Sequence, residues 1–416
     1  MNASALRCPP VVSADRLFSP TALDDPYPVL AELRAQSPVH HLLEQDLYLV
    51  VDHQAVRAAV GMPEVFSSNI VGVLQRGDTG VSFAAARSAG SDVLATADAP
   101  VHAAHRGLVR KRFDRRNVVQ MKAEIDSLIE PRVAALVSSG GGDWMKSVAA
   151  HLPVRVIAGV LGLPPEDSDR LAAWSDNAVE LLAGTTHDAR MGEVTAGIVE
   201  FAGYLRGQLI ARFSRCSGGI SIIDSVAAAV TRDELTEDQG VLFLIQLVTA
   251  GSESTTSLIG NAVRILGLDA DLQRDVRADP TRVSALVEEA LRLESPFRGH
   301  FRVTTEPVQL AGFDLPDQAR LMLLWGSANR DTTVFDQPDI LSLDRPNAKA
   351  HNSFGSGIHF CIGAHLARLE AQCAVSALLD ATTEFATINQ ASYVPSLFIR
   401  RLETLDLTLI ASGSDD

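Results

Sequence analysis

The sequence predicts a mainly α-helical protein with small β-sheets. Its 416 residues are 46% hydrophobic and 21% charged, so the chain can bury a large core. No proline occurs between Pro165 and Pro280, and apolar residues recur in that interval with the 3.6-residue period of helices. Short aliphatic runs flanked by turn residues predict a minor sheet beside the helical bulk.

The individual elements follow from these patterns. Strand-like runs occupy residues 48–51, 308–310 and 320–324. Helical periodicity is clearest over residues 199–213, 238–268 and 364–379. The longest polar, glycine-containing stretch, 76–91, is too short and too interspersed with apolar residues to be a linker. We therefore predict one domain over residues 1–416, of which residues 1–24 are loosely ordered.

Charge and cysteine content exclude several classes of protein. The net charge of −15 disfavours nucleic-acid binding. The first twenty residues lack an apolar stretch, so we expect neither a signal peptide nor a membrane anchor. The longest apolar run, 241–250, is about half of the ~20 residues that span a bilayer. The cysteines lack paired spacing, which favours a reducing, cytoplasmic location; they are Cys8, Cys216, Cys361 and Cys373.

One of these cysteines lies in a glycine-rich loop. Residues 354–363 read Phe-Gly-Ser-Gly-Ile-His-Phe-Cys-Ile-Gly, and helical periodicity follows directly. Such a loop, leading into a helix N-terminus, aims backbone N–H groups at the sulfur and stabilises a metal-bound thiolate. Cys361 is therefore a candidate metal ligand, and a buried free cysteine in a turn is the ordinary alternative.

The loop resembles the haem-binding signature of the cytochrome P450 family. The matching positions are a leading Phe354, Gly357 three residues on, His359 two before the cysteine and Gly363 two after it. The resemblance implies a haem b cofactor (iron protoporphyrin IX) with Cys361 as the axial iron ligand. It also implies that Phe354 and Gly363 belong to the cofactor site.

A second motif lies in the middle of the predicted helix 238–268, where the chain reads Ala-Gly-Ser-Glu-Ser-Thr from Ala250. Small side chains at Ala250 and Gly251 allow a flat macrocycle and a diatomic ligand to approach the helix. The segment resembles the central-helix motif of the P450 family, Ala/Gly-Gly-x-Asp/Glu-Thr-Thr. Taken alone, small and polar residues in a helix more often serve packing or a kink.

The same motif predicts the catalytic residues Glu253, Ser254 and Thr255. A carboxylate and a hydroxyl linked through water can relay protons, and oxygen activation at a haem consumes two protons. Ser254 stands where the family usually has its first Thr, so the motif leaves open which hydroxyl carries the relay. We favour Ser254, because Thr255 lies about 100° further around the helix and is expected to point away from the groove.

Basic residues match the positions at which the family binds the two haem propionates. They are His102, Arg106, Arg302 and His359. Carboxylates need charge-assisted partners, and His102 and Arg106 lie one helical turn apart. Surface salt bridges are the alternative role for each of them.

A further resemblance concerns Glu289 and Arg292, spaced i, i+3, together with Arg345. The family has a Glu-x-x-Arg pair at this distance before the cysteine loop, joined to a third arginine. The resemblance implies a buried structural network, whereas an isolated pair of this kind is usually solvated and weak.

A local cationic cluster stands out against the acidic background; it comprises Arg106, Arg110, Lys111, Arg112, Arg115 and Arg116. A solvated helix face is the ordinary explanation. In the P450 family the corresponding helix flanks the face that an electron donor approaches. The resemblance therefore implies an acidic ferredoxin as partner, with an NAD(P)H-dependent ferredoxin reductase.

The resemblance covers residues 25–409, and segments 296–302 and 323–331 look like the actinobacterial family 144. It implies the triangular P450 fold and a monooxygenase that inserts one oxygen atom from O2 into a small apolar organic substrate. The expected pocket lining comprises parts of residues 70–81, Leu181, Leu182, Leu247, Ala250, Phe297, Leu397 and Phe398, with Arg298 as a nearby charge. A peroxide-using enzyme or isomerase, or a non-catalytic haem sensor, remains the alternative.

Overall fold

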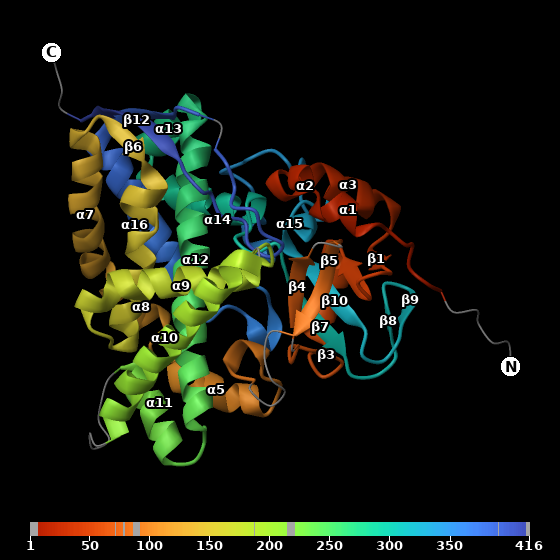
Figure 1. The fold of residues 1–416 in the computed structure, drawn as a ribbon. Coiled ribbons are helices and arrows are strands. Elements are labelled where there is room, and N and C mark those ends of the chain that lie inside the picture. The colour runs from red at the N-terminus through yellow and green to blue at the C-terminus, as the bar shows by residue number, and fades with distance from the viewer. Residues whose placement is uncertain are drawn as a thin grey trace, which may run out of the picture.

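Helices and sheets are segregated in the computed structural model, which describes residues 7–70, 72–77, 80–85, 92–186, 188–213, 221–389 and 391–412. Figure 1 shows most long helices gathered on one side and the largest sheet, with the N-terminal helices, on the other. The predicted mainly α fold with small sheets is confirmed. Cys216 lies outside the described residues.

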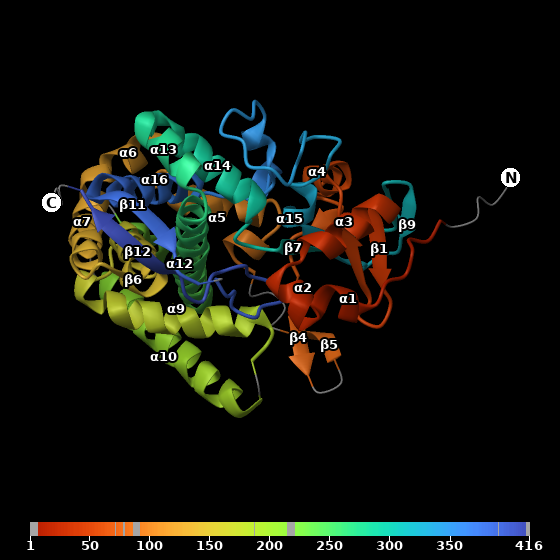
Figure 2. The same ribbon diagram turned by 90° about the horizontal axis from the view of Figure 1, so that it is seen from above.

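The helical side is built around α12 (Glu237–Gly267), which runs through its centre (Figures 1 and 2). A capping box between Thr236 and Gln239 fixes the start of this helix. Around it lie α7 (Lys122–Ser138), α8 (His151–Leu161), α9 (Ser168–Ala183), α10 (Asp188–Phe213), α11 (Ile222–Thr231), α13 (Ala270–Ala278), α14 (Val283–Leu293) and α16 (Ala364–Ala381). The predicted helices 238–268 and 364–379 are confirmed, and 199–213 is the second half of α10.

Shorter helices complete the fold: α1 (Ala14–Phe18), α2 (Pro20–Asp24), α3 (Tyr27–Gln36), α4 (His53–Gly61), α5 (Val101–Val109), α6 (Arg115–Gln120) and α15 (Trp325–Ala328). Among the residues that the structure describes, no helix combines the length and the apolar character needed to cross a bilayer.

The largest sheet has the strand order β1-β2-β10-β7-β3, formed by Val39–Leu42, Leu47–Val50, Arg320–Leu324, Gly299–Thr304 and Phe66–Ser67. Only β2 and β10 are parallel within it. A smaller sheet joins β11 (Thr382–Thr387), β12 (Asp406–Ala411) and β6 (Gly141–Asp143). Two hairpins pair β4 (Gly72–Gly77) with β5 (Gly80–Ala85) and β8 (Val308–Leu310) with β9 (Phe313–Leu315). All three predicted strands are present.

The N-terminal segment differs from expectation. Residues 14–24 form α1 and α2, each capped by a serine, where loose order was predicted over residues 1–24. Leu17, Phe18 and Leu23 are 5%, 3% and 5% exposed and pack into a core shared with the large sheet. Five-residue helices carry too little periodicity to be recognised from sequence, and here burial against the sheet stabilises them.

Candidate functional site

A large cavity with about 240 Å³ of free space lies between the middle of α12 and the loop that precedes α16. Its lining includes every predicted cofactor-binding residue: His102, Arg106, Ala250, Gly251, Arg302, Phe354, His359, Cys361 and Gly363. Residues separated by more than 250 positions in the chain therefore meet around one space, as the motifs predicted.

The cysteine loop is held in a tight conformation. The amide of Cys361 donates to the carbonyl oxygen of Phe354 (2.8 Å), which closes the loop. Gly357 has a φ of +66°, and a Cβ there would lie 2.9 Å from the carbonyl oxygen of Val60, so only glycine fits without strain. Burial raises the pKa of the Cys361 thiol, whereas the Gly363 amide and the charge of Arg106 act in the opposite direction. The loop thus supplies the N–H group, and Arg106 of α5 the positive charge, that a thiolate requires.

The basic residues gather at another part of the cavity wall. Arg302 is only 8% exposed, and no carboxylate of the described residues lies within ion-pair distance of its guanidinium. Burial lowers the pKa of Arg302 to about 10. The rings of His102 and His359 are 4.2 Å apart, and the buried Nε2 of His359 has no hydrogen-bond partner within the described chain.

This donor set fits a haem. A buried guanidinium without a counter-charge is costly, and a ligand carboxylate would relieve that cost. Arg106 reaches the same wall, where its Nη2 donates to the carbonyl oxygen of Phe360 (2.8 Å). A flat group with two carboxylates and a metal would therefore find carboxylate partners in Arg302, Arg106 and the two histidines, and a metal ligand in the sulfur of Cys361.

The face of α12 that borders the cavity carries two hydroxyl groups. Ser254 lines the cavity and donates from Oγ to the carbonyl oxygen of Ala250 (2.8 Å). Thr255 also lines it, so the expectation that Thr255 points away from the groove is wrong. Consecutive residues of a helix are about 100° apart around its axis. The cavity borders a wider arc of α12 than that, so the side chains of both Ser254 and Thr255 reach it. A Cβ at Gly251 would lie 3.0 Å from Ile157 of α8, so this glycine also serves helix packing.

Glu253 does not line the cavity. Its side chain is buried, and Oε1 lies 3.2 Å from Nε of Arg401. Nη1 of Arg401 lies 3.6 Å from Oδ1 of Asp176 on α9. Burial raises the pKa of Glu253 to about 7; Arg401 lowers this pKa and Asp176 raises it. The acid and the alcohol were expected to pair, but they project from different sides of α12, and the acid contacts an arginine.

Sequence reasoning missed Arg401, Asp176 and a second buried acid. Glu370 of α16 is 2% exposed and lines the cavity, and burial raises its pKa well above the ordinary value. Nothing in the sequence links Arg401 to Glu253, because the contact depends on how the C-terminal segment crosses α12. For Glu370, the only signal in the sequence is an acidic residue nine positions after Cys361.

The predicted structural network is present beside the cysteine loop. Glu289 and Arg292 are 0% exposed, and their Oε1 and Nε atoms are 2.7 Å apart. Nε of Arg345 lies 3.1 Å from the same carboxylate, and the amide of Ser342 donates to it. Burial raises the pKa of Glu289, but these donors outweigh it and lower the pKa overall.

The expected substrate-contacting residues are only partly in the cavity. Leu247, Ala250 and Phe297 line it, together with Leu94, Ile157 and Leu258. Arg298 and Leu397 line a separate, smaller cavity instead. Phe297 and His300 line the large cavity and Arg298 does not, because the segment before β7 is irregular and does not follow the two-residue alternation of a strand. Leu181, Leu182, Phe398 and the described part of residues 70–81 are absent from its lining.

Comparison with known proteins agrees with this geometry. Residues 221–381 match the family model of cytochrome P450. The chain is 36% identical to Cytochrome P450 144 of Mycobacterium tuberculosis, over 95% of this chain and 92% of that protein. It is 32% identical to Vitamin D(3) 25-hydroxylase of Pseudonocardia autotrophica, over 94% of this chain and 96% of that protein.

A solved structure leads to the same conclusion. Cytochrome P450 CYP109Q5 from Chondromyces apiculatus superposes with a TM-score of 0.81 at 32% identity, covering 97% of this chain and 99% of that one. The predicted likeness to family 144 and the predicted P450 fold are both confirmed. On the evidence of its fold, its cysteine-lined cavity and its relatives, the chain belongs to the cytochrome P450 family of haem-thiolate monooxygenases.

Proposed function

We propose that this P450 takes electrons from a ferredoxin and inserts one oxygen atom from O2 into a small, mainly apolar organic substrate. One substrate molecule, one O2, two electrons and two protons give the oxygenated product and one water. The proposal is carried by the composition of one cavity. Cys361, the hydroxyl groups of α12, and several leucine and phenylalanine side chains all line it.

The cavity residues divide into cofactor and substrate contacts. A haem held here would bind dioxygen and supply the oxidising power for the insertion. Cys361 would supply its thiolate ligand, and His102, Arg106, Arg302 and His359 would hold its propionates. Phe354, Gly363, Ala250 and Gly251 would flank the macrocycle. Leu94, Leu247 and Phe297 would hold the substrate by apolar burial.

Protons would be delivered through α12. The hydroxyl of Ser254 already donates to the Ala250 carbonyl and keeps its lone pairs free to accept from a water. Glu253 has a pKa of about 7, so it can both take and release a proton near neutral pH. To serve the cavity its carboxylate would turn away from Arg401 toward the side of Ser254. Thr255 is the alternative hydroxyl, since it lines the same cavity and makes no hydrogen bond within the described chain.

Electrons would enter on the cysteine side. Arg110, Lys111, Arg115 and Arg116 are exposed, and none of them forms an ion pair within the described residues. The helix α6 that carries Arg115 and Arg116 packs against α16, which begins directly after the cysteine loop. Ile358 and Phe360 of that loop are 38% and 41% exposed. A cationic rim with exposed apolar residues fits an acidic ferredoxin.

The thiolate assignment can be tested by spectroscopy. The reduced, carbon-monoxide-bound protein should show the red-shifted Soret band of thiolate ligation, and Cys361→His should lose it. Cys8→Ser, which changes an exposed cysteine, should retain the band and serves as the control. If the band persists in Cys361→His, Cys361 is not the ligand.

Turnover then separates the proposed function from its alternatives. A ferredoxin, its reductase and NAD(P)H should support product formation from any ligand that displaces the distal water and shifts the Soret band. A peroxide-using enzyme would form product with peroxide and gain nothing from the donor system. A sensor would form no product under either condition.

A further inference from the structure

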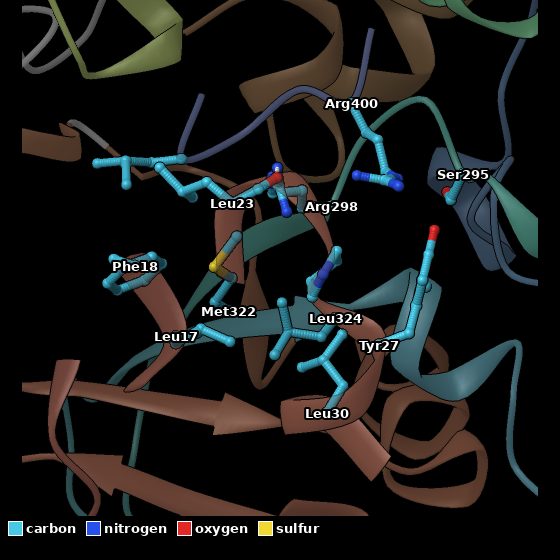
Figure 3. A pocket seen from close by; sticks show the side chains of 13 residues that line it. Leu17, Phe18, Leu23, Tyr27, Leu30, Ser295, Arg298, Met322, Leu324 and Arg400 are labelled. Atoms are coloured by element: carbon cyan, nitrogen blue, oxygen red, sulfur yellow. Dashed lines mark hydrogen bonds between the residues drawn. The ribbon is translucent and has the colours of Figure 1, made fainter. Parts of the chain in front are cut away.

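A second cavity, with about 20 Å³ of free space, lies between the N-terminal helices and the large sheet. That space admits a water molecule or a small ion but no organic ligand. Figure 3 shows apolar side chains, including Leu17, Met322 and Leu324, on one side of it. The polar ends of Arg298, Arg400 and Ser295 lie on the other side.

Arg298 forms no ion pair with the described residues, and the carboxylate of Glu294 acts on it only from beyond ion-pair distance. Its Nη2 donates to the carbonyl oxygen of Leu23, and its buried Nε has no hydrogen-bond partner. No carboxylate of the described chain lies within ion-pair distance of it. Burial lowers the pKa of Arg298 to about 10, so the guanidinium is charged at neutral pH. Arg302 is likewise buried without an ion-pair partner, and its pKa is likewise lowered. Arg302 borders the haem cavity, where a carboxylate of the ligand is expected to bind it.

The neighbouring acid, Glu294, compensates Arg298 only in part: its charge raises the pKa of Arg298, but burial and Arg400 outweigh it. Glu294 accepts hydrogen bonds from Arg400 (2.6 Å), Arg264 (3.0 Å) and the Tyr27 hydroxyl (2.9 Å). One carboxylate is therefore shared by two arginines, and the charge of Arg298 is left over. A buried positive charge without a partner is destabilising unless an anion is bound beside it.

Ser295 supplies a second observation that points to a ligand. Its side chain is 2% exposed and lines the cavity, yet its Oγ has no hydrogen-bond partner in the described chain. A hydroxyl can donate to an anion, and buried polar atoms are rarely left unsatisfied in native proteins. Water would satisfy this hydroxyl but would leave the charge of Arg298 uncompensated.

We propose that the small cavity is a binding site for one small monovalent anion of the chloride class, held by Nε of Arg298 and Oγ of Ser295 in the positive field of Arg400. The bound anion would connect the segment that carries Leu17 and Leu23 to the sheet strand that carries Met322. It therefore stabilises the packing of the N-terminal helices, and it is separate from the haem cavity.

The direct test is diffraction from crystals of the haem-loaded enzyme grown with bromide in place of chloride. An anomalous peak is expected inside the cavity, in contact with Arg298 Nε and Ser295 Oγ. Bromide peaks confined to the molecular surface, with a water-like density or none in the cavity, would overturn the proposal.

A solution experiment tests the same site independently. Chloride is exchanged for gluconate, which is too large for the cavity, at constant ionic strength, and the thermal midpoint of the haem-loaded enzyme is measured. Ligand binding to the folded state predicts a midpoint that rises with the logarithm of the chloride concentration. Arg298→Met should make the midpoint insensitive to chloride, and Ser295→Ala should shift the response to higher chloride concentrations.

Arg16→Met is the matched control, since it removes a positive charge from an exposed ion pair on α1. It should keep the chloride response of the wild type. Equal chloride responses in the wild type, Ser295→Ala and Arg298→Met would exclude the site. If Arg298→Met does not fold, Ser295→Ala and the bromide crystals decide the question.

Discussion

Ser254 and Glu253 are consecutive residues of α12, yet Ser254 lines the haem cavity and Glu253 contacts Arg401. The 100° step between neighbouring helical residues separates them. Proton delivery through both residues therefore requires a movement of the Glu253 side chain or an intervening water. Arg401 sets the starting position of that movement, because it holds the carboxylate on the far side of the helix.

The choice between the two hydroxyls can be decided by uncoupling. Ser254→Ala removes the hydroxyl at the motif position, so electrons should be consumed and hydrogen peroxide released while product falls. Thr255→Ala should stay coupled. The measurement is hydrogen peroxide and product formed per NAD(P)H consumed. Strong uncoupling in Thr255→Ala alone would transfer the role to Thr255, and coupling in both variants would exclude a hydroxyl relay.

Arg401 should control the pH dependence of the reaction. Its positive charge lowers the pKa of Glu253, which burial raises to about 7. Arg401→Gln removes that charge, so the pKa of Glu253 should rise and the pH profile of coupled turnover should move to higher pH. Arg401→Lys retains the charge and should keep the wild-type profile. An identical profile in Arg401→Gln and wild type between pH 6 and 9 would exclude this role.

At the scale of elements, α14 is joined to the segment before the cysteine loop by the Glu289–Arg292–Arg345 network. Both partners of the central pair are fully buried, so removal of one charge leaves the other without compensation. The network ties α14 to the backbone segment that leads into the cysteine loop. We therefore expect it to position that loop.

We expect Glu289→Gln to reduce the free energy of unfolding by about 3–5 kcal/mol at neutral pH. The pKa of Glu289 is lowered in the folded state, so its contribution is present above the unfolded value of 4.5 and is lost as the pH falls through the folded value. Equilibrium urea unfolding across that pH range tests both statements. Glu234→Gln, in an exposed ion pair, should leave the urea midpoint nearly unchanged. Equal effects of the two substitutions would contradict a buried network.

Long elements and contiguous motifs could be predicted from the sequence, and contacts made by side chains between distant segments could not. The helix α12 was predicted within one residue at each end, because 31 residues carry a strong helical period. The cysteine loop was recognised because its residues are adjacent in the chain. Arg401, by contrast, meets Glu253 through the path of the C-terminal segment across α12, where Ser257 Oγ donates to the carbonyl oxygen of Arg400.

Arg298 illustrates a second limit of sequence reasoning. It was expected near the substrate as the charge beside the predicted pocket residue Phe297, but only Phe297 and His300 of this segment border the haem cavity, together with Pro296. The direction of a side chain in an irregular segment depends on the backbone torsions, which the sequence pattern does not specify. The structure turns Arg298 toward the N-terminal helices, where the carbonyl oxygen of Leu23 accepts from it.

At the scale of the whole molecule, two cores enclose the haem cavity from different directions. One core contains α12 and α16, and another lies between the large sheet and α4 and contributes Trp325 and Phe297 to the cavity lining. The cysteine loop and α12 belong to the helical side, whereas Arg302 comes from β7 of the sheet. The cavity therefore forms only when both parts are folded against each other.

The charge distribution of the whole molecule leads to the last prediction. The net charge is −15, so an acidic ferredoxin would be repelled at long range, and the proposed docking relies on local attraction by the cationic residues of 110–116. Reversal of Arg110, Arg112 and Arg116 to glutamate should slow haem reduction by roughly tenfold or more at low salt. Because a Debye length is ~8 Å at physiological ionic strength, added salt should slow the wild type toward the variant's rate.

The matched control reverses Arg16, Arg190 and Arg232, which are exposed and belong to surface ion pairs elsewhere. This control changes the net charge by the same amount, so it separates local attraction from overall repulsion. Stopped-flow reduction of the haem by ferredoxin, measured across a salt series, compares the three proteins. The control should keep a reduction rate that falls steeply with salt, whereas the 110–116 variant should show a nearly flat dependence. If both triple variants show the same decrease in reduction rate and the same loss of salt dependence, the effect comes from net charge alone. In that case the ferredoxin does not dock on α5 and α6.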